Sequence, residues 1–319
     1  MKKIAIILLA FILMVSTAAC SKEEEKKVVR ISISKSYGTT TSNIMKEYGI
    51  LEKYLPDNYE VEWKFMTSSS DMRDALVAGQ LNIVCTSLPT FITSYENGMP
   101  LALISFAGAV PIGLYGNDDT ITSVADITTE DRIATKSKGN NGHIAFMIHN
   151  YMELGDAYTL DDNIAIIQEA EALALLQSSD EYVAGNFSFP YTVKAEEAGL
   201  HEIANYSQII EDYGIGSTYF TTQDYYKENK EVTGALRAAQ EEALQLIKDD
   251  KEGVAETLST VFEVPKEDII TALEQTPPTN EYKGYDKLAG FLYEIGLVEH
   301  EPTKFSEMFN YEDLEVWSK

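Results

Sequence analysis

The chain has 319 residues, and its 51 acidic side chains against 25 basic ones give a formal net charge of −26 at pH 7. Because phosphate binding needs a basic face, this acidity argues against a nucleic-acid partner. The length leaves room for one large domain or two medium-sized domains with a substantial buried core.

The first twenty residues have the pattern of an export signal that ends in a cysteine. Lys2 and Lys3 precede an apolar run over residues 4–15, which is too short to span a bilayer. Small residues then lead to Cys20, as in the lipobox of bacterial lipoproteins. We therefore predict a lipoprotein signal peptide over residues 1–19 and a lipid, such as palmitate, on Cys20; the alternative is an ordinary signal peptide with a chance cysteine.

The residues after the cleavage site predict a short tether. Residues 20–27 are rich in lysine and glutamate and are typical of a solvated linker. Cleavage leaves 319 − 19 = 300 residues and, with Lys2 and Lys3 lost, changes the net charge from −26 to −28. Such an acidic body is repelled by anionic headgroups, so we expect attachment to the extracytoplasmic face of the cell membrane through the lipid on Cys20.

The chain has two cysteines, Cys20 and Cys85. Acylation of Cys20 leaves Cys85 without an intramolecular partner, which excludes a disulfide framework. Cys85 lies in an apolar stretch that is typical of a buried strand, so we expect a small core residue and not a catalytic thiol.

Strands and helices alternate from residue 28 onward. In the first block we expect strands over residues 28–33, 60–65, 83–85 and 101–107, and helices over 42–54, 70–78 and 89–97. A second block begins near Tyr115, with strands over 132–135, 163–167 and 182–185 and helices over 142–153, 169–177 and 191–197. The remainder is mostly helical, over 231–248, 251–261, 266–274 and 285–295. Alternation of this kind predicts parallel strand pairing in an α/β layer fold.

Motifs of catalysis, metal binding and cofactor binding are absent from the sequence. The four histidines are scattered, and we expect surface or cap positions for them: His143, His149, His201 and His300. There is no nucleophile elbow and no phosphate loop, and the acidic pairs lack the spacing of a calcium loop. The sequence therefore predicts no enzyme, no metal and no cofactor.

Several segments together resemble the solute-binding proteins of ABC importers, and more narrowly the nitrate, sulfonate, taurine and thiamine-precursor binding family. Residues 74–89 contain a helix, the Gly79 turn, a short strand and then small residues before Pro89. The other matching segments are residues 96–104, 121–127, 138–142, 171–176, 186–191, 295–298 and 305–309. The chain departs from the family at Asn140 and Asn141 and at residues 178–180, and these departures concern the ligand more than the fold.

The resemblance implies a two-lobed, type II periplasmic-binding-protein-like α/β fold, with parallel-rich sheets flanked by helices and two crossing hinge strands. Lobe one then comprises residues 28–110 and 216–319, and lobe two residues 111–215. The ligand lies in the cleft, which closes by a hinge motion. The implied partners of this monomer are a small-molecule solute and an ABC permease with a cytoplasmic ATPase.

Loops at the carboxyl ends of the predicted strands are the expected place for the ligand. The candidate contacts are Tyr37, Thr39, Ser87, Phe106, Asn140, Asn141, Gly142, Asn186 and Phe187. Turn or cap duty explains the polar residues nearly as well, and core packing explains the two phenylalanines. The arginines Arg30, Arg73, Arg132 and Arg237 fall outside these loops, which disfavours a sulfonate or nitrate, although Lys138 could pair with an anion.

The sequence therefore predicts capture of a small, pyrimidine-like heteroaromatic solute and its delivery to a permease. Two alternatives remain open. One is a pyrimidine-synthesising enzyme that shares this fold and uses histidine chemistry, and the other is a sensory lipoprotein that binds a solute for signalling.

Overall fold

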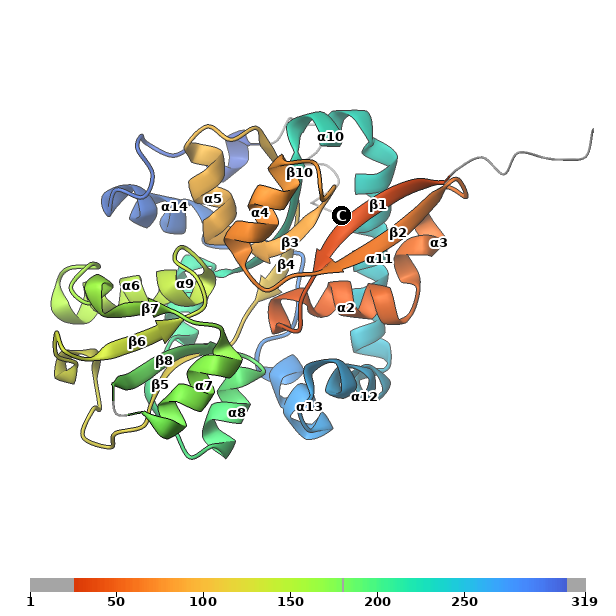
Figure 1. Cartoon of the computed structure of the whole chain (residues 1–319). Coiled ribbons are helices and arrows are strands. Elements are labelled where there is room, and N and C mark those ends of the chain that lie inside the picture. Colours follow the sequence, from red (N-terminus) through yellow and green to blue (C-terminus); the bar gives the residue numbers. More distant parts are fainter. Residues whose placement is uncertain (1–25, 180, 309–319) are drawn as a thin grey trace, which may run out of the picture.

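The computed structural model describes residues 26–179 and 181–308. The predicted signal peptide, Cys20 and most of the predicted tether lie outside the described residues. The described chain forms two α/β lobes that lie side by side (Figure 1). We call lobe one the part built on strands β1–β4 and β10, and lobe two the part built on strands β5–β9.

Lobe one contains two small sheets that meet at an isolated bridge between Ile31 and Ile83. β1 (Lys27–Ile33) pairs in parallel with β2 (Tyr59–Phe65). β10 (Gly216–Thr222) lies antiparallel between β3 (Val84–Ser87) and β4 (Leu101–Ala109). The helices between these strands are α2 (Thr40–Glu47), α3 (Ile50–Tyr54), α4 (Ser69–Val77) and α5 (Leu88–Glu96).

Lobe two contains a five-stranded sheet in the order β7-β6-β8-β5-β9. β6 is parallel to β7 and β8, whereas β5 is antiparallel to β8 and β9. Its strands are β5 (Ile112–Gly116), β6 (Arg132–Thr135), β7 (Ile164–Ile166), β8 (Tyr182–Ser188) and β9 (His201–Asn205). Its helices are α6 (Asn141–Leu154), α7 (Glu169–Ser178), α8 (Tyr191–Glu197) and α9 (Ser207–Tyr213), with short 3₁₀ turns η2 (Val124–Asp126) and η3 (Asp161–Asn163).

The chain crosses between the lobes twice, from β4 into β5 and from α9 into β10. β5 and β10, the strands that follow these crossings, pair antiparallel with their neighbours, so both lobes mix the two kinds of pairing. The predicted fold class, a two-lobed periplasmic-binding-protein-like α/β fold, is confirmed. The predicted lobe boundaries between residues 110 and 111 and between 215 and 216 stay predictions.

The C-terminal part is helical and packs mostly on lobe one. Its helices are α10 (Gln223–Glu228), α11 (Lys230–Asp249), α12 (Lys251–Phe262), α13 (Lys266–Gln275) and α14 (Tyr285–Glu294), followed by the turn η4 (Phe305–Glu307). α11 contacts α2, α3 and β4, while α14 contacts both α5 and α9. Gln240 on α11 is buried and binds the edge of β4, accepting a hydrogen bond from Ser105 Oγ and donating one to the carbonyl of Phe106, both at 2.6 Å.

The structure divides the predicted helix over residues 42–54 into α2 and α3. Gly49 separates them in the left-handed conformation, with φ of 61°, which glycine adopts without steric cost. The pattern also missed the strands β5, β9 and β10 and the short helices α9 and α10. Their tertiary neighbours support these elements; β10, for example, pairs on both sides.

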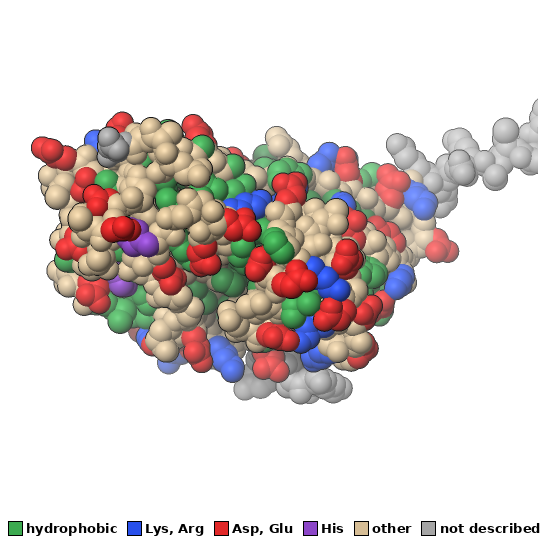
Figure 2. All heavy atoms as spheres, turned by 90° about the horizontal axis from the view of Figure 1, so that it is seen from below, with side chains coloured by type: hydrophobic (Ala, Val, Ile, Leu, Met, Phe, Trp, Pro, Cys, Tyr) green, Lys and Arg blue, Asp and Glu red, His purple; other side chains and the backbone are tan. Residues whose placement is uncertain are grey.

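Most buried apolar residues form a core that extends through both lobes, and a smaller cluster surrounds Phe187 in lobe two. Among the described residues, no helix is both long and apolar enough to cross a membrane. Acidic side chains are spread over the lower face of both lobes, with basic ones between them (Figure 2). That face offers no continuous basic surface for a phosphate backbone.

Candidate functional site

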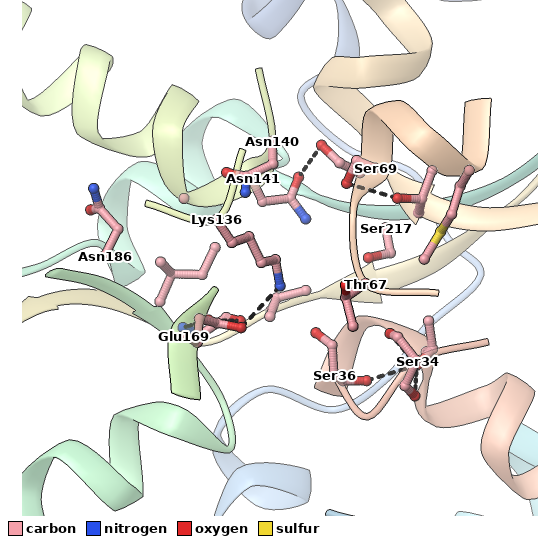
Figure 3. A pocket seen from close by; sticks show the side chains of 18 of the residues that line it. Ser34, Ser36, Thr67, Ser69, Lys136, Asn140, Asn141, Glu169, Asn186 and Ser217 are labelled. Atoms are coloured by element: carbon pink, nitrogen blue, oxygen red, sulfur yellow. Dashed lines mark hydrogen bonds and ion pairs between the residues drawn. The ribbon is translucent and has the colours of Figure 1, made fainter. Parts of the chain in front are cut away.

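A cavity of about 50 Å³ lies between the two lobes (Figure 3). Lobe one and the segments beside it contribute mainly hydroxyl side chains, from Ser34, Ser36, Thr39, Thr67, Ser69, Thr86, Ser87 and Ser217. Lobe two contributes Thr135, Lys136, Asn140, Asn141, Gly142, Glu169, Asn186 and Ser188. Met72, Cys85, Val110 and Ile112 complete the wall. The volume is far below the ~300–1,000 Å³ of drug-sized pockets, so the cavity suits a small solute.

Hydrogen bonds between the lobes close this cavity. Ser87 Oγ at the end of β3 donates to Asn141 Oδ1 at the start of α6, at 3.1 Å. Thr90 Oγ1 on α5 donates to the carbonyl of Gly139 at 3.2 Å. These contacts join the first turn of α5 to the loop that opens α6, so the described conformation is a closed one.

The N-termini of α4, α5, α6 and α7 lie at the cavity, since it is lined by Ser69, Ser87, Asn141 and Glu169. The sequence explains these helix starts locally. Ser68 accepts a hydrogen bond from Asp71 N as the cap of α4, and Asn140 accepts one from His143 N at 2.8 Å as the cap of α6. Helix N-termini carry free N–H groups and a partial positive charge, which favour acceptor groups and anions.

Lys136 and Glu169 are the charged side chains among the described residues that line the cavity. Lys136 follows β6 directly, and its Nζ lies 3.1 Å from Glu169 Oε2. Glu169 is the first residue of α7, and its Oε1 accepts hydrogen bonds from Ser188 N at 2.7 Å and Ser188 Oγ at 2.6 Å. The pair therefore joins the ends of two strands to the start of a helix, and its net charge is zero.

Six of the nine predicted contacts line the cavity: Thr39, Ser87, Asn140, Asn141, Gly142 and Asn186. Thr39 and Asn140 also have local duties, because Thr39 Oγ1 donates to the carbonyl of Ser34 and Asn140 caps α6. Asn186 Oδ1 accepts a hydrogen bond from Tyr206 at 3.2 Å, and its Nδ2 is buried without a hydrogen-bond partner among the described residues. Its amide is turned away from Lys136 (Figure 3).

The three predicted aromatic contacts lie elsewhere. Tyr37 is buried, and its hydroxyl donates to the carbonyls of Ala272 and Thr276. Phe106 packs edge-on against Tyr282, and Phe187 is fully buried near Tyr115 in the small cluster of lobe two. Among the described residues that line the cavity, none has an aromatic side chain.

Cys85 lies in the cavity wall, on β3, with its side chain fully buried. The predicted buried strand position is therefore confirmed. Burial raises the pKa of the Cys85 thiol to about 12, so the thiol stays protonated at neutral pH, which is unfavourable for a nucleophile.

Lys136, Glu169 and Ser188 were missed as site residues from the sequence. A signal for them was present, because Lys136 follows a predicted strand directly and Glu169 opens a predicted helix. Lys138, the predicted anion partner, lies outside the cavity wall and pairs with Asp161 Oδ2 at 2.7 Å.

His143 is buried, contrary to the expected surface or cap position. Its Nδ1 accepts a hydrogen bond from Gly139 N at 3.1 Å, and its Nε2 lies 3.4 Å from Asp161 Oδ1. Burial lowers the pKa of His143, so a neutral ring holds the segment that accepts the hydrogen bonds from Ser87 and Thr90. No group of three or more His, Cys, Asp or Glu within the described ranges could hold a metal ion.

No family model matches the chain. In sequence it is similar to the putative aliphatic sulfonates-binding protein of Escherichia coli, with 23% identity over 282 residues, which cover 88% of this chain and 85% of that protein. The crystal structure of the aliphatic sulphonate binding protein SsuA from Escherichia coli aligns with a TM-score of 0.66 and 22% identity, covering 86% of this chain and 95% of that one.

Two further solved structures have the same fold. The alkanesulfonate-binding protein SsuA from Xanthomonas axonopodis, bound to MOPS, has a TM-score of 0.73 and 18% identity, covering 87% of this chain and 96% of that one. The nitrate-binding protein NrtA from Synechocystis has a TM-score of 0.67 and 17% identity, covering 92% and 88%. The predicted resemblance is confirmed: the chain is similar to ABC-type solute-binding proteins and has the periplasmic-binding-protein fold.

Proposed function

We propose that this chain is the extracytoplasmic solute-binding component of an ABC importer. Its lobes close on a small polar solute, which it delivers to a permease driven by a cytoplasmic ATPase. The observation that carries the proposal is the polar interlobe cavity, closed by the hydrogen bond between Ser87 and Asn141. The similarity to solute-binding proteins along 88% of the chain supports it.

The cavity wall favours a solute rich in hydrogen-bond acceptors. Hydroxyl groups, helix N-termini and the Lys136 ammonium all offer hydrogen-bond donors to the same small space. The lack of arginine argued against sulfonates, but Lys136 supplies a cation that the sequence argument overlooked. An oxyanion head group, as the name of the Escherichia coli relative suggests, therefore fits this wall.

The pyrimidine-like heteroaromatic solute stays a prediction. A ring gains affinity from stacking on an aromatic face, and the described part of the wall supplies none. The hydroxyl and amide groups could still bind the polar edge of a small ring, so heteroaromatic compounds belong in the ligand panel.

The importer role includes a lipid anchor on Cys20 and a monomeric state, both as proposals. Cells fed labelled palmitate should incorporate label into the native protein and not into a Cys20→Ala variant, which should leave the membrane fraction. Equal labelling of both forms would contradict the anchor. Size-exclusion chromatography with light scattering tests the monomer.

A ligand screen tests the binding function. Thermal unfolding of the mature protein is measured with alkanesulfonates, nitrate and pyrimidines, at concentrations near 100 times the dissociation constant, where binding stabilises by about 2.7 kcal/mol. The matched control is the Ser87→Ala/Asn141→Ala double variant, which loses a closing contact and whose fold is checked by circular dichroism. The proposal is contradicted if no class of solute stabilises the native protein.

The two rival functions have their own outcomes. The enzyme rival requires that the purified protein convert its solute, so recovery of unchanged solute after prolonged incubation dismisses it. The sensory rival requires that uptake of the bound solute continue unchanged in cells that lack the protein. Loss of that uptake supports the importer role.

A further inference from the structure

The wall of the cavity contains a carboxylate, that of Glu169, beside the ammonium of Lys136. A carboxylate in the wall repels a simple anion but can bind a cationic group of a solute. We infer that the solute carries one charged group of each sign and that the Lys136–Glu169 pair selects it by charge. This inference rests on the proposed function and specifies its solute class.

Both members of the pair have unused hydrogen-bonding capacity. A carboxylate oxygen accepts about two hydrogen bonds, and Glu169 Oε1 already accepts two from Ser188. Oε2 accepts the bond from Lys136 Nζ at 3.1 Å, which leaves it one further position for an N–H of the solute. The ammonium has three N–H groups, and its contact with Glu169 uses one of them.

The pair lies where a solute can reach it. Lys136 and Glu169 both line the cavity, and their side chains are only 19% and 10% exposed. The ammonium lies between Glu169 and the side of the cavity formed by Thr67 and Ser36 (Figure 3). Little water surrounds the pair, so its charges act on a bound solute with little screening.

The charges of the wall residues determine which solutes the cavity prefers. Lys136 and Glu169 together contribute no net charge, and the other described wall side chains are uncharged, so any remaining positive charge is the partial charge of the helix N-termini. A solute with a single negative charge is attracted by Lys136 but repelled by Glu169, whose Oε2 lies only 3.1 Å from the Lys136 ammonium. A solute with both charges can align opposite to the pair, with its acidic group on Lys136 and its ammonium on Glu169 Oε2.

Glu169 also has a structural role, because it holds Ser188 at the end of β8. The Glu169→Gln variant separates the two roles. Glutamine keeps a carbonyl oxygen that can accept from Ser188 but has no charge. If Glu169 were only structural, this variant would lose stability without any change in the charge preference of binding.

Isothermal titration of the purified mature protein with matched compounds tests the inference. The pairs are β-alanine against propionate, and aminoethanesulfonate against ethanesulfonate. We expect at least one amino compound to bind about tenfold tighter than its partner without the amino group. In Glu169→Gln this ratio falls to about two or less and the simple anion binds more tightly, whereas Lys136→Gln weakens binding of every anion by about tenfold or more.

Glu62→Gln is the matched control, since it removes the same charge from an exposed ion pair on lobe one, outside the cavity. It should keep the native ratio. The inference is overturned if a simple anion or a neutral pyrimidine binds the native protein at least as tightly as both amino compounds, if Glu169→Gln keeps the ratio, or if none of the four compounds binds. The proposed function is overturned separately, when the broad ligand screen finds no solute of any class.

Discussion

Ser87 in lobe one and Asn141 in lobe two are joined across the cavity by a hydrogen bond of 3.1 Å. Each residue is also at the start of a helix, Ser87 as the cap of α5 and Asn141 as the first residue of α6. One contact therefore closes the lobes and aligns two helix N-termini on the same space. Under the proposed function, closure and ligand contact would therefore be coupled through the same two side chains.

Replacement of Asn141 by alanine should weaken solute binding. The loss of one hydrogen bond of about 1 kcal/mol from the closed state predicts roughly five-fold weaker binding, with a smaller change in the free energy of unfolding. Titration calorimetry and urea unfolding measure the two quantities. Asn58→Ala is the control because Asn58 is exposed on lobe one. A loss of stability in Asn141→Ala without any change in solute affinity would contradict the prediction.

Tyr37 should affect stability and not direct ligand contact. Its buried hydroxyl donates to the carbonyls of Ala272 at 2.9 Å and Thr276 at 2.7 Å. Tyr37→Phe leaves these carbonyls without that donor, which should lower the free energy of unfolding by about 1–3 kcal/mol. Tyr54→Phe, which changes an exposed hydroxyl, should cost far less; urea unfolding compares the two variants.

The case of Tyr37 shows why the site could be predicted only in part. The loop after the first strand does line the cavity through Ser36 and Thr39, because strand ends in α/β folds follow from local patterns. The residues that cover Tyr37 come from α13 and the segment after it, as many as 239 residues later in the chain. No local pattern shows such a contact.

The contact between Lys136 and Glu169 is a second one that local sequence patterns do not show. Each lies at the end of an element that the periodicity predicted, yet their contact spans 33 residues and depends on how α7 packs on the sheet. Most strands and most helices were predictable because their apolar periodicity is local. β10, in contrast, pairs with strands that are distant in sequence, which no local pattern shows.

Gly214→Ala should destabilise the crossing into β10 strongly. Gly214 has φ of 62°, and an added Cβ would lie 1.8 Å from the carbonyl oxygen of Lys283. The positive φ costs about 1–2 kcal/mol by itself, and the clash adds to it. Gly79→Ala isolates the first cost, since Gly79 has φ of 71° and open space around it. Equal midpoints of urea unfolding for the two variants would show that Lys283 can move away freely.

Stability should depend on pH through His143. Burial lowers the pKa of the folded ring, and Lys138 lowers it further, while Asp161 raises it. The unfolded chain binds a proton near the ordinary pKa of about 6.5. Below that pH the unfolded state takes up a proton more readily than the folded state, so the contribution of His143 is complete above about pH 7 and is lost as the pH falls.

Thermal unfolding from about pH 8 to about pH 5 checks this sign. His143→Gln should flatten the fall in melting temperature at low pH, because glutamine cannot bind the proton. Burial lowers the pKa of His149 as well. The melting temperature of the His143→Gln/His149→Gln double variant should therefore depend even less on pH. Protonation of His143 also removes the acceptor for Gly139 N. The carbonyl of Gly139 accepts the hydrogen bond from Thr90 that joins the two lobes. Solute affinity of the native protein should therefore weaken over the same pH range. If affinity stays constant while stability falls, the loop that contains Gly139 does not contribute to closure of the lobes.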